Sequence, residues 1–62
     1  MNAEAVSERI NRLVQKHREL HDQVAQLERR AYLTPDERRM VTELKKLKLH
    51  AKDQIFALRQ QL

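Results

Sequence analysis

The segment Thr34-Pro35-Asp36-Glu37 constrains this chain most, because it marks the beginning of a helix near the middle of the sequence. Thr34 is a preferred N-cap residue, whose hydroxyl accepts from a backbone N–H that the first helical turn leaves free. Pro35 suits the first helical position, where a missing N–H costs nothing and the fixed φ already fits. Glu37 stands three residues after Thr34 and completes a capping box, while Asp36 places negative charge at the positive end of the helix dipole. A helix is therefore predicted from residue 35 onward, with a break in the chain before it.

The composition favours helices on both sides of this break. The 62 residues include no Gly and one Pro, and good helix formers such as Leu, Ala, Glu, Lys, Arg and Gln dominate. Charged residues make up 35% of the chain, which suits solvated helices better than a thick globule. We predict one all-α domain, an antiparallel two-helix hairpin, with a helix over residues 3–31, a turn at residues 32–34 and a helix over residues 35–62.

The first predicted helix carries a heptad repeat, in which every third or fourth residue is apolar. We call these residues the seam, because the pattern predicts that they face the other helix. His17 is the polar member of this row and is expected to set the register of packing, as buried polar residues do in coiled coils. The seam residues are Val6, Ile10, Leu13, His17, Leu20, Val24, Leu27 and Ala31.

The second predicted helix has a weaker seam but more apolar surface outside it. Its seam residues are Val41, Leu44, Lys48, Ala51, Ile55, Leu58 and Leu62. The aliphatic stem of Lys48 can cover the seam while its amine reaches solvent. Met40 and Leu47 flank the seam on one side, and Leu49 and Phe56 lie nearly opposite them around the helix. These four residues either face solvent singly or pack against another chain.

The size of the chain favours the second of these alternatives. A hairpin of two helices has a small core, and this chain has no Cys for a disulfide. Association with a second copy or with a protein partner is the remaining source of stability, and two hairpins can combine into a four-helix bundle. We therefore expect a small interaction module that self-associates or docks on another protein.

The residues also resemble a known family. The matching features are the Thr34-Pro35 turn with Glu37 and the string Leu-Lys-Lys-x-Lys-Leu-x-x-Lys-Asp-x-Ile at residues 44–55, which is the most specific part. Over residues 13–58 the chain resembles the YdcH-like family, short bacterial proteins grouped as a domain of unknown function. The resemblance implies a helical hairpin in a bacterial cytoplasm and supplies no catalytic or binding residues. Ala51 departs from the larger apolar residue expected there, which weakens the seam locally or permits close approach of the helices.

Positive charge is concentrated in the second helix. The chain carries a net charge of +4, and residues 38–52 alone carry six Lys or Arg against Glu43. Arg38, Lys45 and Lys52 recur every seven residues and therefore form one basic row. We expect Glu28 to pair with Arg38 near the turn and the other two to lack an acidic mate.

A basic row of this kind allows a second function. Unpaired cations in a row can follow phosphates, so the alternative is a nucleic-acid-binding accessory protein that uses Arg38, Lys45 and Lys52. Against it, the chain offers only Tyr32 and Phe56 for stacking on bases, and a solvated charged face is the commoner case. A membrane surface is a weaker alternative, suggested by the apolar residues beside the row.

Nothing in the sequence indicates an enzyme, a cofactor or a small-molecule substrate. It has no nucleophilic triad, no glycine-rich phosphate loop and no paired carboxylates across a cleft, and a hairpin is expected to offer Lys48 no pocket. His17 and His21 are four residues apart, as in a two-point metal clamp, but a structural site needs more ligands, so no metal is expected. No signal peptide and no membrane-length apolar run is visible, so the expected location is the cytoplasm.

Overall fold

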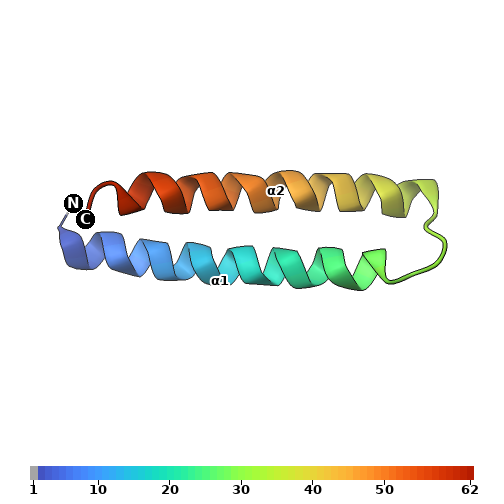
Figure 1. Ribbon diagram of the computed structural model, residues 1–62, viewed down its shortest axis with the longest axis horizontal. Coiled ribbons are helices and arrows are strands. Elements are labelled where there is room, and N and C mark those ends of the chain that lie inside the picture. The colour runs from blue at the N-terminus through green and yellow to red at the C-terminus, as the bar shows by residue number, and fades with distance from the viewer. Residues whose placement is uncertain (1) are drawn as a thin grey trace.

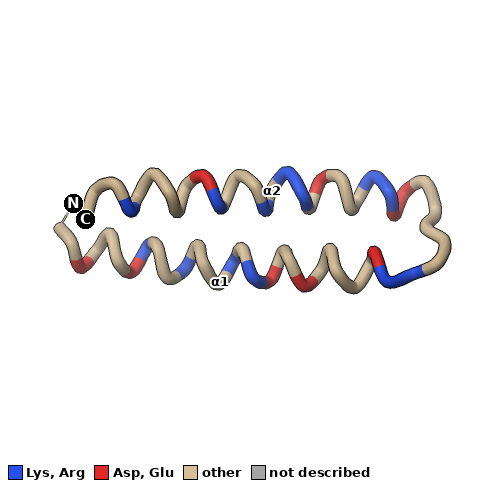
Figure 2. The backbone as a smooth tube through the Cα atoms, in the orientation of Figure 1, with Lys and Arg blue, Asp and Glu red and all other residues tan. Residues whose placement is uncertain are grey.

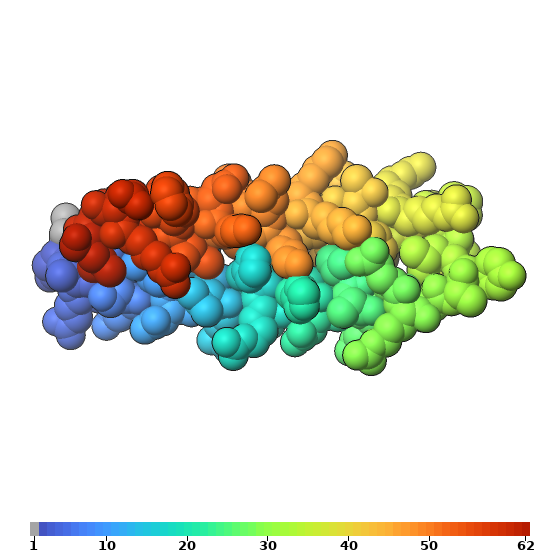
Figure 3. Space-filling model, in the orientation of Figure 1, coloured from blue at the N-terminus to red at the C-terminus, as the bar shows by residue number. Residues whose placement is uncertain are grey.

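Two antiparallel α-helices make up the fold. The computed structural model describes residues 2–62, in which α1 spans Ala3–Glu28 and α2 spans Pro35–Arg59 (Figure 1). The helices contact one another along their length (Figure 3), and the backbone measures 46 × 14 × 12 Å. The predicted all-α helical hairpin is confirmed.

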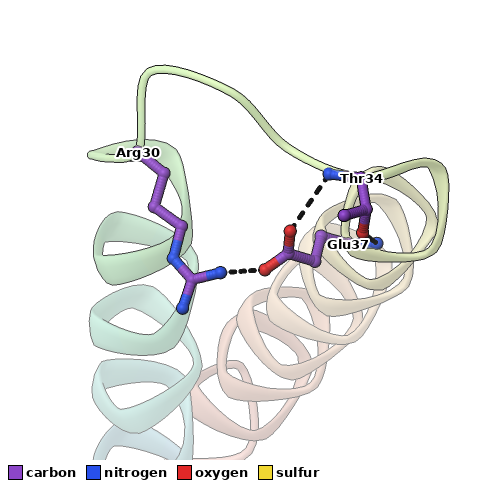
Figure 4. A network of polar contacts seen from close by, with 3 residues as sticks. All are labelled: Arg30, Thr34 and Glu37. Carbon is purple, nitrogen blue, oxygen red and sulfur yellow. Dashed lines mark hydrogen bonds and ion pairs between the residues drawn. The ribbon is translucent and has the colours of Figure 1, made fainter.

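The beginning of α2 has the predicted capping box. Thr34 is extended, with φ −66° and ψ 160°, and its hydroxyl accepts from the backbone N–H of Glu37 at 3.1 Å. The Glu37 carboxylate in turn accepts from the backbone N–H of Thr34 at 3.0 Å. The guanidinium of Arg30 pairs with the other carboxylate oxygen of Glu37 (Figure 4). One carboxylate therefore ties the start of α2 to the segment that leaves α1.

These contacts also change the acidity of Glu37. Its pKa lies below the ordinary value of 4.5, chiefly because the backbone N–H of Thr34 donates to the charged carboxylate. The positive charge of Arg30 lowers the pKa further. The cap is therefore formed by the ionised carboxylate and weakens when that group is protonated.

The first helix ends earlier than predicted. It stops at Glu28, so the connection covers residues 29–34 and not only residues 32–34. The N–H of Arg30 donates to the carbonyl of Leu27 at 3.2 Å, the tighter spacing with which many helices close. Arg29 and Arg30, which the heptad pattern assigns to the helix, instead follow its carboxyl end, where the helix dipole favours cations. Ala31 is consequently exposed and is not a seam residue.

The second helix also ends early, at Arg59 and not at residue 62. The N–H of Gln61 donates to the carbonyl of Leu58 at 3.0 Å, which again tightens the last turn. Leu62 lies beyond this point and is exposed, so it is not a seam residue.

The core follows the rest of the two predicted seams. Val6, Ile10, Ile55 and Leu58 form a buried cluster toward the end of the hairpin away from the turn. Ala51 is only 4% exposed, so its small side chain lies fully within the contact between the helices. No polar or charged side chain is buried anywhere in residues 2–62. The polar seam residues remain half-buried instead and lie at the margin of the core. They are His17 and Lys48.

Candidate interaction surfaces

One side of the hairpin has an open groove between α1 and α2, with a volume of about 730 Å³. We call it the basic groove, because four Lys or Arg side chains line it and no Asp or Glu does. Apolar side chains from both helices line it together with two histidines. The lining residues are Val14, His17, His21, Lys45, Lys48, Leu49, Lys52, Ile55 and Arg59.

The groove contains part of the predicted basic row. Lys45 and Lys52 line it, whereas Arg38, in the first turn of α2, does not. The row predicted from the sequence was incomplete, because Arg59 follows Lys52 by the same seven residues and also lines the groove. Extending the repeat by one heptad would have found Arg59. The expectation that Lys48 has no pocket beside it was wrong, since Lys48 lines the same groove.

One ion pair closes the turn end of the groove. The amine of Lys45 lies 3.2 Å from a carboxylate oxygen of Glu28, and both side chains are about half exposed. The predicted pair between Glu28 and Arg38 is therefore wrong, and Lys45 does have an acidic mate. Side chains of a helix lean toward its own amino end. In an antiparallel hairpin Glu28 thus leans away from the turn and Lys45 leans toward it, so they meet.

Lys48 bridges the two helices across the groove. Its amine lies 2.8 Å from Nδ1 of His21 and donates to the ring nitrogen when that atom is unprotonated. This contact engages His21, one of the two histidines of the suggested metal clamp. Across the described residues, no three His, Cys, Asp or Glu side chains gather where they could hold a metal ion.

The other cations of α2 have few acidic neighbours. Lys46 pairs with Glu43 on the outer side of the helix at 3.6 Å. Neither Lys52 nor Arg59 forms an ion pair with any carboxylate in the described part of the chain. Figure 2 shows that Lys and Arg (blue) outnumber Asp and Glu (red) along α2. The middle and far end of the groove therefore carry uncompensated positive charge.

The two apolar rows of α2 are open to solvent, as their spacing outside the seam predicts. Met40 and Leu47 are each 52% exposed, while Leu49 is 59% and Phe56 68% exposed. In α1, by contrast, every large apolar side chain is buried or half-buried. Leu49 lines the basic groove, but Met40 and Leu47 do not. The hairpin thus has one apolar row beside the groove and another, the Met40–Leu47 row, away from it.

These features define a small helical hairpin whose second helix has two uncovered faces. Within residues 2–62, neither helix is long and apolar enough to cross a membrane. The chain belongs to the family described as Protein of unknown function (DUF465), whose model matches residues 10–59. YdcH-like proteins are members of this family of small bacterial proteins, which confirms the resemblance seen in the sequence. No curated protein and no solved structure matches the chain.

Proposed function

We propose that this protein is a non-catalytic interaction module of the bacterial cytoplasm that associates with a second copy of itself through α2. The observation that carries the proposal is the unequal exposure of the two helices. The seam residues of each helix are covered by the other helix. Outside the seams, only α2 has large apolar side chains that are exposed to solvent. Exposed apolar rows on one element of a small domain are typical of a surface that another chain covers.

The Met40–Leu47 row is the better of the two faces for self-association. If two copies met through their basic grooves, the Lys and Arg side chains of one would face those of the other, and like charges repel. The Met40–Leu47 row lies outside the groove and avoids this repulsion. A two-fold axis beside α2 would place Met40 of one copy near Leu47 of the other, since two-fold contacts are self-complementary.

The dimensions of the hairpin are sufficient for such a contact. A face of 46 × 14 Å covers about 640 Å² on each copy, or about 1,300 Å² in total if the whole face is used. Specific protein–protein interfaces bury roughly 1,200–2,000 Å² in total, so a dimer along the long axis reaches the lower part of this range. The stability of the resulting four-helix assembly would increase with the protein concentration, as it does for every association.

Sedimentation equilibrium over a hundredfold range of concentration tests the proposal. The wild type should shift from monomer to dimer, and its melting temperature should rise with concentration. Leu47→Glu should abolish the shift, while the matched variant Leu49→Glu, with the same change on the other apolar row, should leave it in place. A cooperatively melting monomer whose melting temperature is independent of concentration would refute self-association.

A further inference from the structure

We propose that the basic groove is a docking site for an acidic amphipathic helix of a partner protein. The groove lies away from the Met40–Leu47 row, so this inference does not depend on self-association. Three features on the described residues carry it. They are the shape of the groove, the alternation of residues along it and its uncompensated charge.

The shape suits a helix. From Lys45 to Arg59 the groove follows α2 for fourteen residues, which at 1.5 Å per residue is about 21 Å, or four helical turns. It lies between α1 and α2, so a rod placed in it contacts both. Such a rod would be the third helix of a bundle, and an amphipathic helix in an apolar groove is a recurring mode of peptide recognition.

The alternation of residues defines what the partner helix must present. Lys45, Leu49, Lys52, Phe56 and Arg59 follow one another at steps of four and three, so they lie on one stripe of α2. Basic and apolar side chains alternate along this stripe, and all of them line the groove except Phe56, which is 68% exposed beside it. A helix docked against it is complementary when carboxylates and apolar side chains alternate at the same steps.

The floor beneath this stripe is apolar and continuous with the core. Val14 is half-buried, packs against the Val6–Leu58 cluster and lines the groove from α1. Ile55, a member of that cluster, lines it from α2. An apolar side chain entering the groove would therefore extend the existing core, which adds burial without requiring the hairpin to open.

The charge of the groove requires an acidic partner. Lys45 has Glu28 as a neighbour, but Lys52 and Arg59 have no carboxylate partner in residues 2–62. Complementary carboxylates on a docked helix would neutralise these two cations and steer the encounter. The outer face of α1 has acidic residues but no exposed large apolar side chain, so a second copy is not complementary to the groove.

A nucleic acid fits the groove less well than an acidic helix. Phosphates would satisfy the cations, but they would leave the apolar floor of Val14, Leu49 and Ile55 uncovered. The only aromatic rings that line the groove are the imidazoles of His17 and His21, and no Phe, Tyr or Trp lines it, so bases have little surface on which to stack. Arg38, the third cation of the row predicted for nucleic acid, lies outside the groove.

Fluorescence anisotropy with a labelled 16-residue peptide tests the inference on the full chain. The peptide has Leu and Glu alternating at steps of four and three, and a second peptide has Lys in place of each Glu. The Leu/Glu peptide should bind, and its affinity should fall as salt is added. The Leu/Lys peptide should not bind. Failure of the Leu/Glu peptide to bind at low salt overturns the proposal.

Two charge-reversed variants locate the binding. Lys52→Glu with Arg59→Glu should lower the affinity about tenfold, because each change replaces an attraction by a repulsion. Arg38→Glu with Arg39→Glu changes the net charge by the same amount outside the groove and should leave the affinity nearly unchanged. Equal losses in both double variants would show attraction to overall charge and would overturn the proposal. Circular dichroism checks that each variant is folded.

The competing ligands are tested with the same variants. A 20-nucleotide DNA duplex, a single strand of the same length and vesicles with anionic headgroups are titrated under identical salt. Leu49→Gln should lower the affinity for the Leu/Glu peptide. It should leave the affinity for the DNA duplex unchanged, since phosphates do not contact the apolar floor. Tighter binding of DNA or vesicles than of the peptide, lost in the Lys52/Arg59 variant, would assign the groove to that ligand instead.

Discussion

The cap of α2 gives the most direct prediction on stability. In Thr34→Ala the hydroxyl that accepts from the N–H of Glu37 at 3.1 Å is absent, and that N–H must be solvated instead. Loss of a Thr N-cap typically costs about 1 kcal/mol of folding free energy. For a domain of this size, such a loss lowers the melting temperature by roughly 4–8 °C. Thr34→Ser keeps the hydroxyl and should retain most of the stability.

Arg30 allows the cap to be separated from the ion pair at the same place. Arg30→Ala removes the pair with Glu37 but leaves both capping hydrogen bonds intact. Because the Arg30 side chain is 59% exposed, its loss should cost less than the loss of the Thr34 hydroxyl. The order of stability should therefore be wild type, then Arg30→Ala, then Thr34→Ala.

Circular dichroism melting at one fixed protein concentration measures this order, with urea unfolding as a second estimate of free energy. Amide hydrogen exchange in the first turn of α2 gives a local measure and should be fastest in Thr34→Ala. If Thr34→Ala melts with the wild type and its first turn stays protected, the cap does not hold the beginning of α2. The capping box would then not account for the position at which α2 begins.

Three further predictions follow from the pKa of Glu37, the half-buried Lys48 and the pattern of burial. Because the folded-state pKa of Glu37 is lowered, its contribution to stability is fully present above the ordinary pKa of 4.5 and is lost as the pH falls through the lower pKa of the folded state. The advantage of the wild type over Glu37→Gln in melting temperature should therefore shrink on acidification, and an advantage that stays constant with pH would contradict this role of the carboxylate. Lys48→Leu should raise the free energy of unfolding in urea by about 1 kcal/mol, because an apolar side chain replaces a cation in the seam. The same change should lower the affinity for the Leu/Glu peptide measured by anisotropy. At a protein concentration that keeps the hairpin monomeric, Ile55→Val should lower the free energy of unfolding by about 0.5–1.5 kcal/mol, and Phe56→Ala by no more than about 0.5 kcal/mol. The reverse order would contradict the burial of Ile55 and the exposure of Phe56.

The beginning of α2 and the contact between the helices could be predicted because their causes are local. Thr34, Pro35 and Glu37 act within one turn, and the heptad rows repeat every seven residues, so neighbours in sequence contain the whole signal. The end of α1 could not be predicted in the same way. Both arginines after Glu28 are good helix formers, so local propensity gives no signal for the end of α1, and the contact of Arg30 with Glu37 in the connection joins residues seven apart.

The pair between Lys45 and Glu28 and the groove beside it depend on register, which heptad positions alone do not give. The sequence suggested Arg38 as the partner of Glu28, but which cation of the basic row lies opposite Glu28 depends on the length of the turn and the lean of each side chain. The basic row was visible in the spacing, whereas the hollow beneath it became apparent only once Val14 and Ile55 were placed on its two walls.

The groove lies where the seam of α2 is weakest, and this connects the stability of the hairpin to its proposed role. Lys48 and Ala51 occupy seam positions that a coiled coil normally fills with larger apolar side chains, and Lys48 lies half-buried at the margin with its amine on His21. A Leu at residue 48 would extend the core outward and fill this margin. The sequence instead keeps a cation there and an open apolar floor beside it. A third helix with carboxylates and apolar residues would supply the contacts that the seam of α2 omits, so the local weakness of the hairpin and the proposed docking site have the same structural cause.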